Sequence, residues 1–193
     1  MSPLAVEPAR LLRLSLAEYH RLIESGGLDE DARVELIDGL LVAMSPKTPA
    51  HEGALNWLLA WLFARVDQRR YTVRAGSPLT LAGSEPEPDL SVVERGTPTP
   101  YHPASAALVV EISHSSLRHD LGPKAAVYAS ANVNELWVVD LDGGRVLVHR
   151  HARGEEWAEI RVAPADGHVT ADAVGLPALP VGELLNAAAG EAV

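Results

Sequence analysis

The chain has 193 residues, a formal net charge of -10 and no cysteine. This length suits one globular domain, and the lack of cysteine excludes disulfides, zinc-thiolate sites and thiol catalysis and favours a reducing, cytoplasmic setting. The acidic balance opposes unaided binding to a polyanion, because nucleic-acid affinity comes largely from Lys and Arg contacts to phosphate. A nucleic-acid partner therefore requires local positive charge, bound metal or a second protein.

The sequence contains no signal for membrane insertion. The longest apolar run, residues 58–64, is too short to span a bilayer. The N-terminus has no basic segment followed by the apolar core of a signal peptide. We expect a cytoplasmic protein without membrane contact, in which one domain over residues 15–186 is flanked by flexible tails at 1–14 and 187–193.

The first elements are indicated by local capping and turn chemistry. Ser15 and Glu18 have the spacing of a capping box, which predicts a short helix that stops at the glycines 26–27. Asp38-Gly39 lies between two apolar segments and supplies the positive φ angles of a tight turn. We therefore predict a β-hairpin over residues 33–44.

The middle of the chain combines a helix with three strands. Thr48 predicts an N-cap with Pro49 in the first helical position, and apolar residues then recur at helical spacing until about Gln68. Strand-like segments follow at about 71–81, 89–94 and 106–113. The last is a continuous apolar run, as is typical of a strand covered on both faces.

The C-terminal part is predicted to complete a mixed sheet. Asp120 is interpreted as the N-cap of a helix over 121–131, with Pro123 tolerated in its first turn. We predict a buried strand over 135–140, which a glycine turn at 142–144 joins to a hairpin partner over 145–149. The segment 163–185 is rich in Pro and Gly and is expected to wrap the sheet edge before a short final turn. The predicted fold class is α/β or α+β, a mixed sheet with packed helices.

Two acidic residues stand inside apolar runs. A carboxylate in a buried strand costs several kcal/mol unless its charge is compensated, so Asp89 and Glu111 each require a partner. The alternation of a strand puts Glu111 and Ser113 on one face, and helical spacing puts Lys124 on the apolar stripe that should meet the sheet. A metal ion is the simplest shared partner for the two carboxylates.

Taken together, several motifs resemble the Uma-type putative restriction endonuclease family of the PD-(D/E)XK nuclease superfamily. The resemblance runs from about Ser15 to Leu185, and its specificity lies in the order of the motifs. These are Val34-Glu35-Leu36-Ile37-Asp38-Gly39, Ser45-Pro46 with His51, Glu87-Pro88-Asp89-Leu90, Val109-Val110-Glu111-Ile112 with Ser115-Ser116, Asp120-Leu121-Gly122 with Lys124, Tyr128-Ala129 and Glu135-Leu136-Trp137-Val138-Val139-Asp140.

The resemblance implies a restriction-endonuclease-like core with an N-terminal helix and β-hairpin, and a DNA endonuclease that hydrolyses phosphodiester bonds with Mg²⁺ or Mn²⁺. Asp89 and Glu111 would be catalytic metal ligands. Lys124 would replace the lysine that the family motif places where this chain has Ser113. Glu35, His51 and Ser113 are candidate accessory residues. The family context also suggests a homodimer.

Other interpretations remain open at this stage. Glu111 and Lys124 are also compatible with a purely structural ion pair. Glu35 is equally compatible with a solvent-facing hairpin residue, and His51 with a satisfied histidine near a helix start. The acidic charge and the departures His114 and Pro123 leave room for an inactive nuclease fold with a binding or regulatory role. A metal-dependent hydrolase of small nucleotides or phosphates is a third possibility.

The remaining candidates are weaker. A cluster of arginines offers the nearest approach to a basic patch and the only weak candidates for substrate binding, namely Arg65, Arg69, Arg70 and Arg74. Four histidines have spacings that resemble metal ligands but are interpreted as surface residues, namely His114, His119, His149 and His151. The four tryptophans are interpreted as packing residues.

Overall fold

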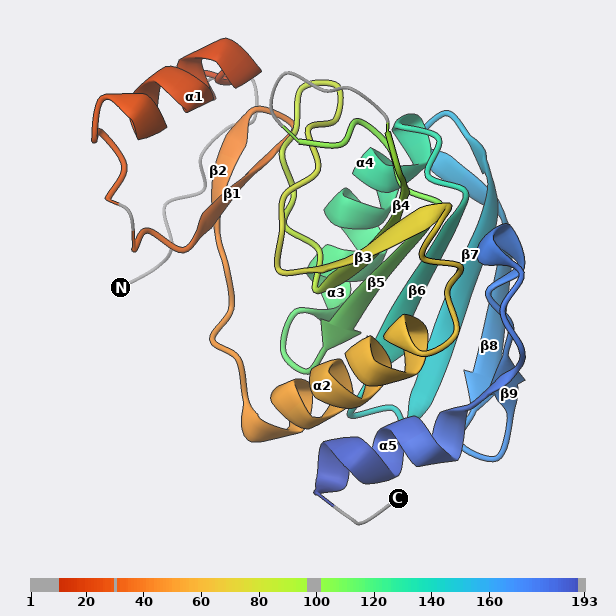
Figure 1. The fold of residues 1–193 in the computed structure, drawn as a ribbon. Helices are drawn as coiled ribbons and strands as arrows, with labels where there is room; N and C mark the ends of the chain where they lie inside the picture. Colours follow the sequence, from red (N-terminus) through yellow and green to blue (C-terminus); the bar gives the residue numbers. More distant parts are fainter. Residues whose placement is uncertain (1–10, 30, 97–101, 191–193) are drawn as a thin grey trace.

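A computed structural model describes residues 11–29, 31–96 and 102–190; the predicted tails therefore lie partly outside the described residues, at 1–10 and 191–193. Six strands form the central sheet (Figure 1). Their order is β3 (Tyr71–Ala75), β4 (Leu90–Glu94), β5 (Leu108–Ser113), β6 (Glu135–Asp140), β7 (Arg145–Arg153) and β8 (Glu156–Pro164). Strands β5 and β6 are parallel, and the other neighbouring pairs are antiparallel. The predicted mixed sheet is confirmed.

The N-terminal helix and hairpin follow the predicted local chemistry. Helix α1 (Leu16–Glu24) begins with the capping box, in which Ser15 and Glu18 satisfy each other's backbone N–H groups. Strands β1 (Val34–Ile37) and β2 (Leu40–Ala43) pair in antiparallel register across residues 38–39. Asp38 and Gly39 have φ angles of 48° and 75°, as a two-residue hairpin turn requires. Both predictions are confirmed.

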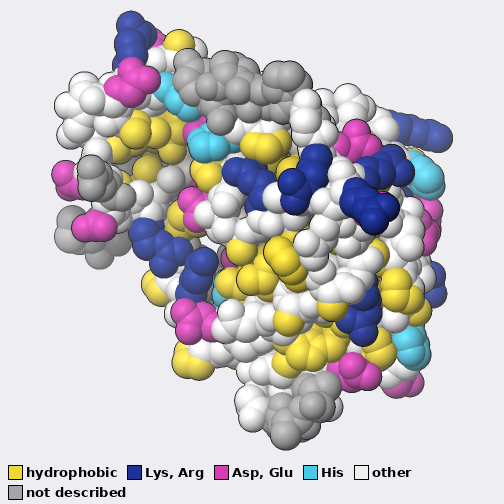
Figure 2. Space-filling model, viewed as in Figure 1, with side chains coloured by type: hydrophobic (Ala, Val, Ile, Leu, Met, Phe, Trp, Pro, Cys, Tyr) yellow, Lys and Arg dark blue, Asp and Glu magenta, His cyan; other side chains and the backbone are white. Residues whose placement is uncertain are grey.

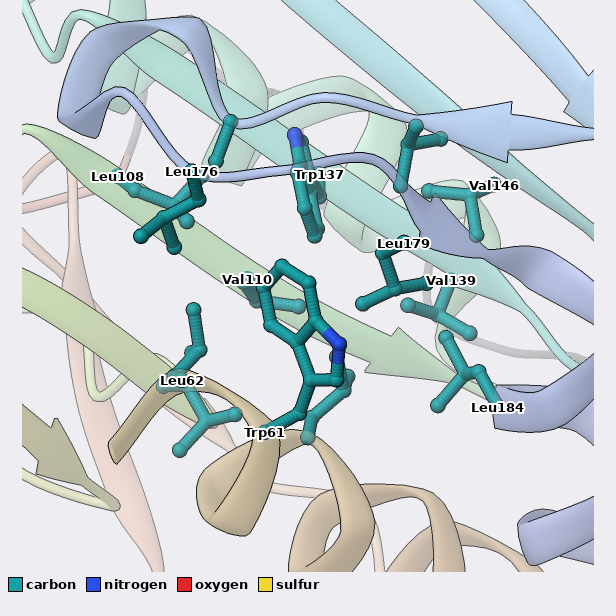
Figure 3. Close-up of a cluster of buried hydrophobic side chains, with 14 of the residues drawn as sticks. Trp61, Leu62, Leu108, Val110, Trp137, Val139, Val146, Leu176, Leu179 and Leu184 are labelled. Atoms are coloured by element: carbon teal, nitrogen blue, oxygen red, sulfur yellow. The ribbon is translucent and has the colours of Figure 1, made fainter. Parts of the chain in front are cut away.

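One face of the sheet is covered by α2 (Pro49–Phe63) and α5 (Val181–Ala189) (Figure 1). Figure 3 shows the hydrophobic core between this face of the sheet and the helices, where Trp61 and Leu62 of α2 face Val110 and Trp137 of the sheet. Thr48 caps α2 through its side chain, as predicted, but the helix ends at Phe63 rather than near residue 68. No helix within the described ranges has the length and apolar character needed to cross a bilayer.

The opposite face carries α3 (Leu117–His119), the π-helical turn η2 (Asp120–Lys124) and α4 (Ala125–Ser130). These three segments are continuous, and Tyr128 packs with Val109 and Val138 of the sheet in a second buried cluster. Because β5 is sandwiched between the two clusters, all six of its residues are buried. The prediction that this strand is covered on both faces is confirmed.

The interpretation of Asp120 as an N-cap is wrong. The helical segment already begins at Leu117, and Asp120 lies inside the π-helical turn with 4% exposure. Its Oδ2 accepts hydrogen bonds of 2.6 Å from the hydroxyls of Ser113 and Ser116. The two hydroxyls compensate the carboxylate, so it is buried against β5 instead of capping a helix. The irregular turn accommodates Pro123, which has no N–H to donate.

The sheet edges and the C-terminal segment differ from the prediction. Strand β3 ends at Ala75, and β8 was not predicted at all. A small two-stranded sheet, separate from the central sheet and from the β1–β2 hairpin, forms from β9 (His168–Val169) and β10 (Leu179–Pro180), with a 3-10 turn, η3 (Asp172–Val174), between the two strands. The expected short final turn is the nine-residue helix α5. The sequence of β8 lacks the hydrophobic pattern of a buried strand, because most of its residues are exposed.

Candidate active site

A cavity of about 370 Å³ opens where the β1–β2 hairpin meets the start of α2, the end of β5 and the α3–η2 segment. Acidic and basic side chains lie close together on the side of the molecule where the hairpin joins the body (Figure 2). Side chains from all of these elements and from the segment before β4 line the cavity, namely Glu35, His51, Asp89, Glu111, His119 and Lys124. The fold therefore brings the three predicted catalytic residues together, with Glu35 and His51 beside them.

Lys124 is held between two buried carboxylates. Its Nζ lies 2.8 Å from Oε1 of Glu111 and 3.1 Å from Oε2 of Glu35. Tyr128, one helical turn after Lys124, donates a hydrogen bond of 2.6 Å to the same Oε1 of Glu111. Among the described residues both partners of Glu111 thus use Oε1, which leaves Oε2 for a ligand in the cavity.

Burial dominates the ionisation of this group of side chains. It raises the pKa of Glu111 to about 8 against the opposing effect of Lys124, and the negative charges of Asp120 and Asp89 raise it further. Burial alone would lower the pKa of Lys124, but Glu111, Glu35 and Asp120 outweigh it and raise that pKa. The ammonium group of Lys124 therefore stays charged, whereas a negative charge on Glu111 is only partly compensated by its neighbours. A cavity with an undercompensated carboxylate favours an additional cation.

Glu35 is a constituent of the site and not a solvent-facing hairpin residue. Burial opposes its ionisation, but contacts with His119, Lys124 and the N–H of Glu87 together lower its pKa. His119 Nε2 lies 3.3 Å from Oε1 of Glu35, and the Glu87 N–H donates to Oε2 at 3.2 Å. The carboxylate of Glu35 is therefore ionised and anchors both Lys124 and His119.

Asp89 is oriented by two neighbours. The backbone N–H of Ile112, on β5, donates to its Oδ2 at 2.8 Å, and Nε2 of His51 lies 2.9 Å from its Oδ1. These contacts tie the aspartate to the strand that carries Glu111. His51 Nδ1 is buried without a hydrogen-bond partner in the described part of the chain. Such an orphan polar atom next to a cavity is suited to water or a bound group.

We expect Glu111 to make stability fall as pH rises when no divalent ion is present. Folded Glu111 retains its proton up to about pH 8, whereas the unfolded side chain releases it near 4.5, so ionisation in this range favours unfolding. The contribution is at most about 1.4 kcal/mol per pH unit, the slope for one proton. Urea unfolding at pH 5 to 8 should give a flatter profile for Glu111→Gln than for the wild type.

The exposed Glu155 provides a matched control for this experiment. Glu155→Gln should reproduce the wild-type pH profile, because its side chain is in solvent in both states. Parallel profiles for Glu111→Gln and wild type would contradict the raised pKa of Glu111.

The donor set fits a divalent cation that retains water ligands. Within the described ranges, no three His, Asp or Glu side chains are grouped closely enough to hold a metal by themselves. Mg²⁺ is commonly bound by one or two carboxylates, and water and substrate oxygens complete its shell. Asp89 and Glu111 supply two carboxylates at one cavity, and the undercompensated charge of Glu111 favours a cation there.

Other predicted candidates lie away from the cavity. Ser113 is buried and donates to Asp120, so it supports the turn beneath Lys124 and does not line the cavity. The four candidate arginines are also absent from the cavity lining. Arg65 stacks on Trp61, and Arg70 pairs with Glu94. Arg74 donates to the carbonyl of Pro78, and the backbone N–H of Arg69 donates to Asp67 in the turn before β3.

Two histidine interpretations are wrong. His119 faces the cavity and contacts Glu35, and His149 is buried at 2% exposure against the ring of Trp157. His114 and His151 are exposed, as predicted, and pair with Asp142 and Glu159. No local pattern distinguishes His119 from a surface residue, because its partner Glu35 is 84 residues away.

The sequence interpretation also missed residues that complete the cavity. The sequence places Tyr128 in a family motif and on the inward stripe of its helix but predicts no role for it at the site, whereas its hydroxyl donates a hydrogen bond to Glu111. Three exposed basic side chains stand at the rim, from the hairpin, the segment before α2, and α3, namely Arg33, Lys47 and Arg118. The sequence indicates these residues only by their closeness to the family motifs. Arg33 directly precedes the hairpin motif, and Arg118 lies between Ser116 and Asp120.

The fold and the site define a restriction-endonuclease-like protein. A crystal structure of a putative nuclease belonging to DUF820 from Anabaena variabilis superposes with a TM-score of 0.74 and 16% sequence identity, covering 91% of this chain and 99% of that one. At this identity the likeness concerns the fold. A search of curated proteins found no match.

Family membership follows from the sequence itself. The model of the Uma2 family, described as putative restriction endonuclease, matches residues 16–182. Since this match spans most of the chain, the protein belongs to the Uma2 family, a nuclease family. The family resemblance inferred from the ordered motifs is confirmed.

Proposed function

We propose that this chain is a cytoplasmic DNA endonuclease that requires Mg²⁺ or Mn²⁺. One observation carries the proposal: buried Lys124 bridges Glu111 and Glu35 at the wall of a cavity that also contains Asp89. A purely structural ion pair does not need an adjacent cavity, a second carboxylate or an undercompensated charge. Membership of a nuclease family supports phosphodiester hydrolysis as the reaction.

Asp89 and Glu111 would hold the cation. When bound, it would stabilise negative charge on the phosphate and increase the acidity of a bound water. Asp89 is prepared for this role because the Ile112 N–H and His51 fix both of its oxygens. Tyr128 and Lys124 fix Oε1 of Glu111 in the same way. The two carboxylates are thus oriented before any ligand enters, which lowers the cost of binding.

Lys124 would act on the reacting phosphate or on the attacking water. An ammonium group has three donors, and its contacts with Glu111 and Glu35 use two of them. The third is available to an oxygen in the cavity. Because Lys124 is charged and almost fully buried, its field at that oxygen is stronger than in water, which favours stabilisation of developing negative charge.

The rim residues Arg33, Lys47 and Arg118 would bind phosphates that flank the cleaved bond. They supply the local positive charge that a chain of net charge -10 otherwise lacks. We expect Arg118→Ala to weaken DNA binding and to reduce the slope of log affinity against log salt by about one. Fluorescence anisotropy with a labelled duplex in Ca²⁺, at several salt concentrations, measures both quantities. An Arg153→Ala variant, at an exposed position outside the cavity, should retain the wild-type slope.

A cleavage assay tests the function directly. Purified protein is incubated with supercoiled plasmid, linear duplex, single-stranded RNA and free nucleotides, each with Mg²⁺, Mn²⁺ or EDTA. We expect nicking or linearisation of the plasmid with either metal and none with EDTA. Asp89→Asn should be inactive, whereas Glu155→Gln should be fully active.

The substrate panel separates the competing functions. Cleavage of free nucleotides without cleavage of either polymer would replace the endonuclease by a small-phosphate hydrolase, and cleavage restricted to RNA would exclude DNA as the substrate. If the wild type cleaves nothing, or if Asp89→Asn cleaves as well as wild type, the proposed function is wrong.

A further inference from the structure

Strand β8 (Glu156–Pro164) ends the six-stranded sheet on the side opposite to β3 (Figure 1). It pairs with β7 on one side, and no strand in the described part of the chain pairs with its other side. The unpaired N–H and C=O groups of such an edge are a template for another strand. At nine residues β8 is long for an edge strand, and one residue within it, Ala163, is buried.

The two faces of β8 differ in chemistry. Register places Ile160 opposite His149 and Val162 opposite Leu147, so both side chains lie on the sheet face that carries α4. They remain 57% and 49% exposed, among the most exposed large apolar residues described. Glu159 and Arg161 alternate with them and point to the other face. Strand β8 thus offers an apolar row on one face and a pair of opposite charges on the other.

This pattern is complementary to a second copy of itself. In an antiparallel pair of two β8 strands centred on Ile160, residues at equal distances from the centre face each other. Ile160 would meet Ile160 of the second copy, and Ala158 would meet Val162. On the other face, Glu159 would meet Arg161 twice, once on each side of the two-fold axis. A single chain thus supplies apolar contacts and two cross-strand ion pairs, which is the symmetry that an isologous dimer requires.

We propose that two copies of this chain associate through antiparallel pairing of their β8 strands, in the register centred on Ile160. The contact joins the two sheets into one. The inference does not depend on the proposed function, because no β8 residue lines the cavity. It also keeps the Arg70 and Arg74 region at the outer edges of the joined sheet, since β3 is at the opposite edge from β8.

Charge reversal provides a register-specific test. In a homodimer, Glu159→Arg would place two arginines opposite each other at both contacts, and Arg161→Glu would place two glutamates there. Each single variant should therefore raise the dimer dissociation constant at least tenfold relative to wild type. An equimolar mixture of the two variants allows a heterodimer in which each of the two contacts pairs an arginine of one copy with a glutamate of the other, so mixing should restore near wild-type affinity. The double variant Glu159→Arg with Arg161→Glu exchanges the two charges, restores opposite charges at both contacts and should dimerise with near wild-type affinity.

Sedimentation velocity at low salt, over micromolar protein concentrations, measures these equilibria. Glu155→Arg, a charge reversal in the β7–β8 turn outside the paired segment, serves as the control and should dimerise like wild type. Glu159 and Arg161 are exposed, so neither change removes a core contact. Glu159 also contacts His151 within its own chain, at 3.5 Å, so thermal melts of each variant verify that the hairpin is intact. A monomeric wild type, single variants that dimerise normally, or a double variant that stays monomeric would each overturn the proposal.

Discussion

Replacing Lys124 with methionine is expected to lower the free energy of unfolding by about 3 kcal/mol, the scale for removing one partner of a buried ion pair. The change preserves most of the side-chain volume, so packing losses stay small. It leaves Glu111 and Glu35, each about 4% exposed at the side chain, without their shared ammonium partner. Urea unfolding at pH 7 measures the difference.

A second variant distinguishes lost charge from lost packing. Lys124→Met combined with Glu35→Gln removes the ionised carboxylate that the single variant leaves without its ammonium partner, so more than half of the stability lost in the single variant should return. Lys47→Met is the matched control, because Lys47 stands exposed at the cavity rim and forms no ion pair among the described residues. Loss of less than about 1 kcal/mol in Lys124→Met would mean that the buried pair contributes little to stability.

Glu111→Gln and Asp89→Asn are each expected to reduce DNA cleavage about 10³-fold, the upper range for removing one preorganised electrostatic group. Both substitutions keep side-chain size and remove the negative charge on which a cation depends. Glutamine at position 111 still offers an oxygen to Tyr128 and Lys124, so the variant should remain folded. Initial rates of plasmid nicking in Mg²⁺ measure the effect.

The double variant and metal binding complete this test. Because the two carboxylates act on one cation, combining the substitutions should cost little more than either alone. Calorimetric titration with Mn²⁺ should show binding by wild type and by Glu155→Gln, and none by either site variant. If cleavage persists in both site variants, the pair of Glu111 and Lys124 has only a structural role.

Local chemistry was sufficient to predict much of the fold. The capping box and the Asp38-Gly39 hairpin depend on a few neighbouring residues, and both were predicted correctly. Strand β8 could not be found in this way, because an exposed edge strand buries too few side chains to impose a pattern. Asp120 was misinterpreted because a capping aspartate and one buried by hydroxyl donors look the same in sequence; the distinction lies in the folded positions of Ser113 and Ser116.

The candidate site likewise combines features that neighbouring residues predict with features that only the folded chain determines. Helical spacing placed Lys124 on the inward face, and strand alternation directed Glu111 toward it. The contacts of Glu35 and His119 depend on bringing the N-terminal hairpin against α3, segments separated by 84 residues, so no sequence period reveals them. The candidate arginines had the right charge but lie outside the cavity lining, whereas single basic residues near the motifs stand at its rim.

A crystal structure of the protein soaked in Mn²⁺, with anomalous diffraction to locate the ion, tests the central claim most directly. We predict an anomalous peak in the cavity, about 2.1 Å from carboxylate oxygens of Asp89 and Glu111. The peak should disappear in Glu111→Gln crystals soaked in the same way. A cavity without a peak at saturating Mn²⁺, or a peak that persists in Glu111→Gln, would contradict the assignment of these two carboxylates as the metal ligands.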